Sequence, residues 1–107
     1  MRNLNCAVAL GWLVFGIALA PELRASPAPL TGEARRGQSL FERNCAHCHG
    51  DDARGDEGPD LHALKKSDAR ITKVVTQGIK GEMPAFGGKL SPADIKAIIA
   101  FLRTLKD

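Results

Sequence analysis

Apolar and small residues recur at helical spacing in three segments of the chain. The segments span residues 33–48, 68–78 and 92–106. Their predicted inward faces are, in order, Ala34, Gly37, Leu40, Phe41 and Asn44; Ile71, Val74 and Val75; and Ile95, Ile98, Ile99, Leu102 and Leu105, with Phe101 beside them. Spacing of three and four residues buries one side of a helix, whereas no segment alternates as a half-buried strand does. The pattern therefore predicts an all-α chain without internal repeats.

Local signals mark the ends of two of these helices. Gly78 follows the second apolar face, and glycine commonly ends a helix. Ser91 precedes the third helix as N-cap, Pro92 fits its first turn, and Asp94 stands where a capping-box partner is expected. The second helix should therefore end at residue 78, and the third should begin at residue 92.

The N-terminal segment has the layout of a secretory signal. Arg2 precedes 15 consecutive residues without charge, Cys6 to Ala20, and small residues follow. We expect residues 1–25 to be the signal, cleaved between residues 20 and 28, and residues 26–107 to form one domain. Because a membrane-spanning helix needs roughly 20 apolar residues, an uncleaved membrane anchor is the less favoured alternative.

The remaining domain is small for its core. About 80 residues bury too little apolar surface for comfortable stability, and the aromatic residues left are Phe41, Phe86 and Phe101. Two-domain enzymes, nucleotide-binding α/β folds and polytopic membrane proteins are excluded by this length. The domain is expected to need a further stabilising link, such as a bound cofactor.

Charge is distributed unevenly along the domain. Residues 26–107 carry 13 Lys and Arg against 11 Asp and Glu, a net charge of +2, which gives no support for a nucleic-acid partner. Residues 51–60 hold five acids and one Arg, whereas residues 65–89 hold six bases and two acids. The molecule should therefore be dipolar, which affects how it docks to a partner.

The motif with the most specific chemistry is Cys45-Ala46-His47-Cys48-His49. Two cysteines in an exported protein could form a disulfide, a redox pair or half of a zinc site. A zinc site needs further paired ligands, which His47 and His62 do not supply, and a thioredoxin-like pair needs alternating strands and helices. The adjacent His49 favours covalent haem c, in which both thiols bond to haem vinyl groups and the imidazole binds the iron.

A second axial ligand is available further along the chain. Met83 lies 34 residues after His49, in the glycine- and proline-containing segment 78–88. An isolated Met often fills a gap in a core, but this segment is typical of a loop rather than a helix face. His and Met are a standard pair of haem ligands, so we expect His49 and Met83 to be the axial iron ligands.

With these residues the chain resembles a class I c-type cytochrome with a single haem, over residues 31–107. The resemblance rests on the motif of residues 45–49 together with Gly37, Phe41, Gly58-Pro59-Asp60-Leu61, Met83-Pro84 and the C-terminal helix with Phe101. It implies a small cytochrome c fold, with three main helices around one covalently attached haem and the first and last helices crossing at Gly37. Many members use a Trp or Tyr to hold a haem propionate, and residues 26–107 contain neither.

The resemblance also suggests what surrounds the ligands. It implies that the backbone carbonyl of Pro59 accepts a hydrogen bond from His49, although Gly58-Pro59 could be merely a turn. His47 should point outward, and His62 should be a surface or haem-edge residue.

Iron held by protein on both axial sides has no open position for a substrate, which favours one-electron transfer over catalysis. We therefore expect a monomeric, non-enzymatic electron carrier of the periplasm, serving a respiratory chain or a dedicated dehydrogenase. The alternatives are a haem-bearing subunit of a larger oxidoreductase complex and a ligand-binding or peroxidatic haem protein. The alternative location is a membrane-anchored protein facing the periplasm. The expected partners are a redox donor and acceptor docking near the haem edge, where a basic ring could steer them: Lys65, Lys66, Lys73, Lys80 and Lys89.

Overall fold

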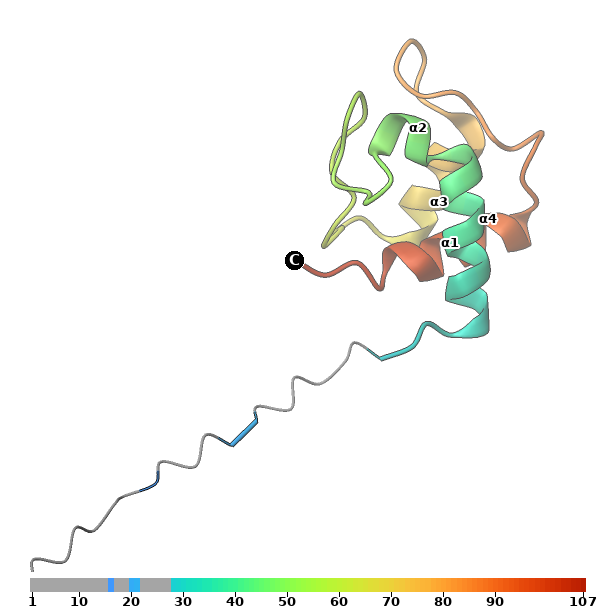
Figure 1. Cartoon of the computed structure of the whole chain (residues 1–107). Coiled ribbons are helices and arrows are strands. Elements are labelled where there is room, and N and C mark those ends of the chain that lie inside the picture. The colour runs from blue at the N-terminus through green and yellow to red at the C-terminus, as the bar shows by residue number, and fades with distance from the viewer. Residues whose placement is uncertain (1–15, 17–19, 22–27) are drawn as a thin grey trace, which may run out of the picture.

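The computed structural model describes residues 16, 20, 21 and 28–107, and four helices lie in the last of these ranges. They are α1 (Gly32–Asn44), α2 (Ala46–His49), α3 (Asp68–Gln77) and α4 (Pro92–Leu102) (Figure 1). The described part contains no strand, apart from an isolated bridge between Ile79 and Met83. The all-α prediction is confirmed. The predicted signal lies mostly outside the described residues.

Helices α1 and α4 cross at a glycine. A Cβ atom built on Gly37 would lie far inside van der Waals contact with the backbone carbonyl of Ala97, which is itself completely buried. Any side chain at residue 37 would therefore push the two helices apart. The family resemblance implied that the first and last helices cross at Gly37, and the contact of Gly37 with Ala97 agrees with this. Figure 1 shows α1 and α4 crossing each other.

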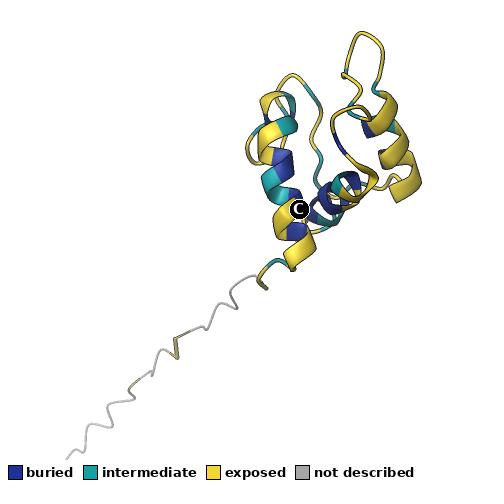
Figure 2. Cartoon of the chain, turned by 90° about the vertical axis from the view of Figure 1, so that its right-hand side faces the viewer, coloured by how far each residue is buried: buried dark blue, intermediate teal, exposed yellow. Residues whose placement is uncertain are grey.

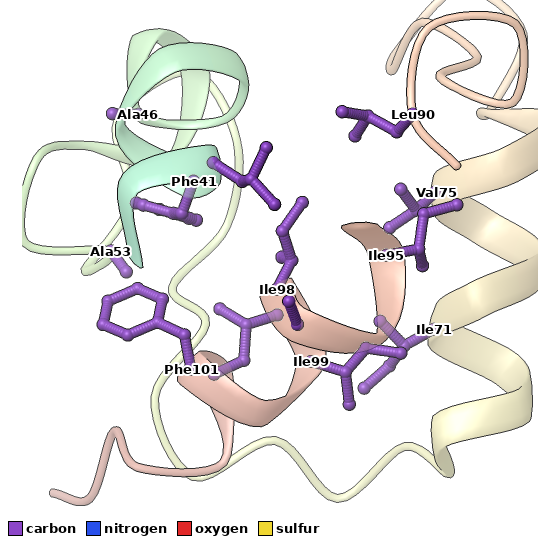
Figure 3. Close-up of a cluster of buried hydrophobic side chains, with 13 residues drawn as sticks. Phe41, Ala46, Ala53, Ile71, Val75, Leu90, Ile95, Ile98, Ile99 and Phe101 are labelled. Atoms are coloured by element: carbon purple, nitrogen blue, oxygen red, sulfur yellow. The ribbon is translucent and has the colours of Figure 1, made fainter. Parts of the chain in front are cut away.

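The core lies on both sides of α4. Phe41 of α1 and Phe101 of α4 pack with ring centroids 5.5 Å apart and planes inclined by 52°, a geometry that aromatic pairs favour. Across α4, Ile95 and Ile99 face the α3 residue Ile71 (Figure 3). Figure 2 shows buried residues on the facing sides of the helices, with exposed residues on the loops. Helix α4 therefore joins α1 and α3 into one core.

The helix predicted over residues 33–48 is instead two helices, α1 and α2, so that prediction was wrong in its extent. Cys45 separates them, with φ −119° and ψ −33°. The Asn44 side chain donates to the Leu40 carbonyl at 2.8 Å, and such side-chain bonds compete with the helical backbone pattern. The cysteine motif consequently occupies a separate short turn.

The third predicted helix also ends earlier than expected, at Leu102 rather than residue 106. The Thr104 hydroxyl donates to the Phe101 carbonyl, and the Leu105 carbonyl accepts from the Ala63 N–H. Leu105 still packs against the core, although it lies outside the helix. Tertiary contacts with the segment before α3 replace the last predicted turn.

The predicted helix ends at Gly78 and Pro92 are confirmed. Gly78 is the C-cap of α3, with φ +68°. At the start of α4, the Ser91 hydroxyl accepts from the Asp94 N–H at 3.1 Å and Asp94 accepts from the Ser91 N–H at 2.9 Å. These bonds lower the pKa of Asp94, chiefly through the Ser91 backbone N–H, and Arg36 of α1 adds an ion pair.

Candidate functional site

The two cysteines lie at the ends of one tight turn. The Cys45 N–H donates to the Phe41 carbonyl at 2.7 Å, and the Cys45 carbonyl accepts from Cys48 and His49 at 3.1 and 3.0 Å. Both thiols are half-buried and neither forms a disulfide within the described residues. The turn therefore offers two reduced sulfurs and an imidazole from five consecutive residues.

The thiol of Cys45 does not have the character of a reactive redox cysteine. Burial, and to a lesser extent the neighbouring Cys48, raises the pKa of Cys45 to about 11. Reactive redox cysteines depend on a lowered pKa, because the thiolate is the nucleophile. This environment speaks against a thioredoxin-like function for the pair.

His49 is buried and oriented by a backbone carbonyl. The residue is only 9% exposed, and its Nδ1 lies 2.9 Å from the carbonyl oxygen of Pro59. With Nδ1 donating this bond, Nε2 is the nitrogen available to a metal ion. The Pro59 carbonyl is thus in the place that the family resemblance implied for it.

The loop that carries Pro59 is tied to the cysteine turn. Gly58 donates to the Cys48 carbonyl at 2.7 Å, and Gly55 donates to the His49 carbonyl at 2.8 Å. These bonds place the loop against the imidazole. A Cβ atom on Gly58 would lie 2.8 Å from Cε1 and 2.9 Å from Nδ1 of the His49 ring.

The two other histidines are placed differently from each other. His47 is exposed, as expected. The His62 side chain is only 10% exposed, and its Nδ1 and backbone N–H both lie 2.8 Å from Asp60 Oδ1. Both bonds lower the pKa of the Asp60 carboxyl, and the bond from the His62 backbone N–H has the larger effect. His62 therefore braces the Pro59 loop and is more enclosed than a plain surface residue.

Met83 is half-buried and packs against the core. Its loop returns to the end of α3, where Phe86 donates to the Val75 carbonyl at 2.9 Å and Gly87 donates to the Thr76 carbonyl at 3.1 Å. The loop borders a shallow depression of about 460 Å³ that is largely open to solvent. The residues that line it are Gln77, Ile79, Lys80, Gly81, Glu82, Met83, Pro84 and Ala85.

The chemistry of these side chains fits a covalently bound haem. Figure 1 shows α2 and the loop after α3 at the same end of the molecule. Apolar side chains of Cys45, of the segment between α2 and α3 and of the loop after α3 remain only partly buried against the core: Cys45, Leu61, Leu64, Met83 and Phe86. Cys45 and Cys48 would hold the porphyrin, His49 and Met83 would bind the iron, and the half-covered side chains would contact its apolar faces.

Sequence reasoning missed the contact of Gly58 with the His49 ring, the two hydrogen bonds of His62 and the bridge between Ile79 and Met83. The Gly58-Pro59 pair signalled a rigid turn, but nothing local indicated how closely the turn approaches His49. Each of these features depends on how the backbone is placed in space, which residue type and spacing do not report.

Comparisons with known proteins identify the family of the chain. The family described as "Cytochrome C oxidase, cbb3-type, subunit III" matches residues 32–102. A cytochrome c-553-like protein of Synechocystis sp. is 36% identical over 71% of the chain and 72% of its own length. The cbb3-type cytochrome c oxidase subunit FixP of Azorhizobium caulinodans is 36% identical over 70% of the chain, which spans only 28% of FixP.

A solved structure shows the same architecture. The KustC0563 c-type cytochrome superimposes with a TM-score of 0.62 at 27% identity, over 66% of this chain and 98% of that one. The small cytochrome c fold implied by the sequence is therefore confirmed. With the family match over residues 32–102 and the Cys45-x-x-Cys48-His49 motif, the chain belongs to the c-type cytochromes, whose haem c is bound covalently.

Proposed function

We propose that this chain is a one-electron carrier of the periplasm, with His49 and Met83 as axial ligands and Cys45 and Cys48 as covalent attachment points. The observation that carries the proposal is the buried His49 ring, whose Nδ1 is engaged by Pro59. When bound, haem c supplies a couple that cycles between Fe(II) and Fe(III). The protein is accordingly proposed to be a carrier rather than an enzyme.

The chain's own residues favour electron transfer because they would fill both axial positions. His49 is held by its backbone acceptor and Met83 by its loop, so neither side is left open for a substrate. Half-buried apolar residues such as Leu61 and Phe86 would limit the access of water to the haem. A neutral thioether in an apolar setting favours the ferrous state and a high potential.

Export is part of the proposal. The apolar run of residues 6–20 supports a cleaved signal, with residues 26–107 as the working domain. None of the helices among the described residues is long and apolar enough to cross a membrane. We propose a monomeric periplasmic protein; a retained N-terminal anchor facing the periplasm is the alternative.

A second candidate function follows from the FixP relatives. The family match names an oxidase subunit, and the chain corresponds to about a quarter of the FixP length. The same fold could therefore serve as the haem-bearing part of an oxidoreductase complex. Size-exclusion of the protein at native abundance separates the two functions, since a free carrier elutes near its monomer mass.

The proposed function is tested with the holoprotein by spectroelectrochemistry and carbon monoxide. We expect a single one-electron wave, and a ferrous form that does not bind carbon monoxide at neutral pH because Met83 keeps its position. A ferrous protein that binds carbon monoxide at once would contradict the carrier function and support the ligand-binding alternative. A wave of more than one electron would contradict it as well.

A further inference from the structure

We propose that Gly78 is a positioning residue for Met83, and that residues 78–83 form a preformed holder for its sulfur. The inference rests on the proposed role of Met83 as iron ligand. It goes further by assigning the placement of that ligand to backbone contacts within the loop, which do not themselves involve the iron.

The first observation is a pair of reciprocal hydrogen bonds. The Ile79 N–H donates to the Met83 carbonyl and the Met83 N–H donates to the Ile79 carbonyl, each at 2.8 Å. A further bond at 2.9 Å joins the Glu82 N–H to the Ile79 carbonyl. Both backbone polar groups of Met83 are thus fixed to one residue four positions earlier, so its Cα cannot move without breaking them.

The second observation is the close approach of Gly78. A Cβ atom there would lie 2.5 Å from the Met83 carbonyl oxygen and 2.7 Å from both the carbonyl carbon of Pro84 and the nitrogen of Ala85. All three neighbours are backbone atoms, which cannot rotate away as a side chain would. The glycine also has φ +68° and ψ −174°, a conformation that is essentially restricted to glycine.

The third observation is that the holder is anchored at its base. Gly78 itself donates to the Val74 carbonyl at 2.7 Å, and the returning chain caps the next two carbonyls of α3, those of Val75 and Thr76. Helix α3 is packed into the core through Ile71 and Val75. The position of Met83 is therefore set by α3, with Gly78 as the contact between them.

The chain supplies matched controls for an alanine scan of the holoprotein. Gly78→Ala introduces the clash and the unfavourable backbone conformation, whereas Gly81→Ala introduces only a positive φ (+79°), because no atom lies within 4 Å of the place its Cβ would take. Gly88→Ala introduces neither. The readouts are the sulfur-to-iron charge-transfer absorption of the ferric protein and its affinity for added imidazole.

We expect Gly78→Ala to lose most of the charge-transfer absorption and to bind imidazole at least about tenfold more tightly, because the Met83-bound state no longer competes fully. Gly81→Ala should change the affinity by less than about fivefold, and Gly88→Ala should match the wild type. If Gly78→Ala and Gly88→Ala gave the same absorption and affinity, the inference would be wrong. If the wild type itself lacked the absorption, the proposed ligation by Met83 would fail instead.

A second measurement decides the question even if Gly78→Ala yields no holoprotein. Amide hydrogen exchange is compared between the wild type and Met83→Leu, both carrying haem. Because the holder consists of backbone bonds, the amides of residues 79 and 83 should remain protected in both proteins, with or without the sulfur. Exchange at the rate of an unstructured peptide in Met83→Leu would show that the iron bond orders the loop, which overturns the inference.

Discussion

The space beside the His49 ring is filled by the backbone of Gly58. Because a Cβ there would approach two ring atoms to within 3 Å, Gly58→Ala should tilt the imidazole away from Pro59. We expect a loss of about 1–3 kcal/mol in the free energy of unfolding, together with a changed reduction potential. Chemical denaturation and potentiometry of the holoprotein measure both effects.

Gly88→Ala is the control for this substitution, because open space surrounds Gly88. If Gly58→Ala had the same stability and reduction potential as Gly88→Ala, the orientation of the His49 ring would not depend on Gly58.

At the scale of elements, Arg103 joins the end of α4 to the start of α3. Its guanidinium donates to the carbonyls of Leu64 and Lys66 at 2.6 and 2.5 Å, and to the Asp68 carboxylate at 2.6 and 3.0 Å. Lys96, on α4, only faces Glu33 at 3.8 Å and is largely exposed. The two residues can therefore be compared directly: Arg103 is a half-buried cation with several acceptors, and Lys96 is an exposed cation on α4.

We expect Arg103→Gln to lower the free energy of unfolding by about 1–3 kcal/mol, because two backbone carbonyls lose a charged donor. Lys96→Gln should change it by less than about 0.5 kcal/mol, as is usual for an exposed pair. Denaturant titration of the two holoproteins makes the comparison. Equal effects would mean that Arg103 does not join the two elements.

The existence of the helices followed from the sequence, but their ends did so only where a local signal was present. Gly78, Ser91 and Pro92 act on neighbouring residues, so the ends they mark were predicted correctly. The break at Cys45 and the end at Leu102 involve the Asn44 side chain and contacts to Ala63, which periodicity does not report.

The same division applies to the site. Cys45, Cys48, His49 and Met83 were named because their chemistry is carried by residue type and spacing. The contacts of Gly58 with the His49 ring and of Gly78 with the Met83 loop were not predicted, since they depend on what lies where the glycine side chain would be. Such distances arise only when the chain is folded, so the sequence itself does not report them.

At the scale of the whole molecule, the cofactor is expected to complete the fold. With a small core and half-covered apolar residues around the site, folding should depend on the binding energy of the haem. Cys45→Ala/Cys48→Ala protein without haem should therefore lack a cooperative unfolding transition by circular dichroism. A sharp transition in that protein would contradict the expectation.

Docking is predicted to use the basic segment around the Met83 loop. Lys80 and Lys89 are exposed on either side of it, and Ile79, next to Lys80 in the chain, is 43% exposed. Charges at the rim of a transient interface act mainly on the association rate, and salt screens them beyond about 8 Å under physiological conditions. Lys80→Glu/Lys89→Glu should slow electron exchange with an acidic partner at low salt, and less so at high salt.

Stopped-flow kinetics over a range of ionic strength measures this effect. Neutralising Asp51, Asp52, Asp56 and Glu57 in the acidic loop is the control. If that control altered the rate and its salt dependence while the lysine reversals did not, the partner would be basic and the docking face would be the acidic loop.

The reduction potential of Met83→His against the wild type tests most directly whether His49 and Met83 together hold the iron. Replacing the thioether by an imidazole should lower the potential by a substantial part of the roughly 0.8 V that axial ligands span. The ferric variant should also lose the sulfur-to-iron absorption while its haem remains attached through Cys45 and Cys48. An unchanged potential with an unaltered reduced spectrum would show that Met83 does not bind the iron.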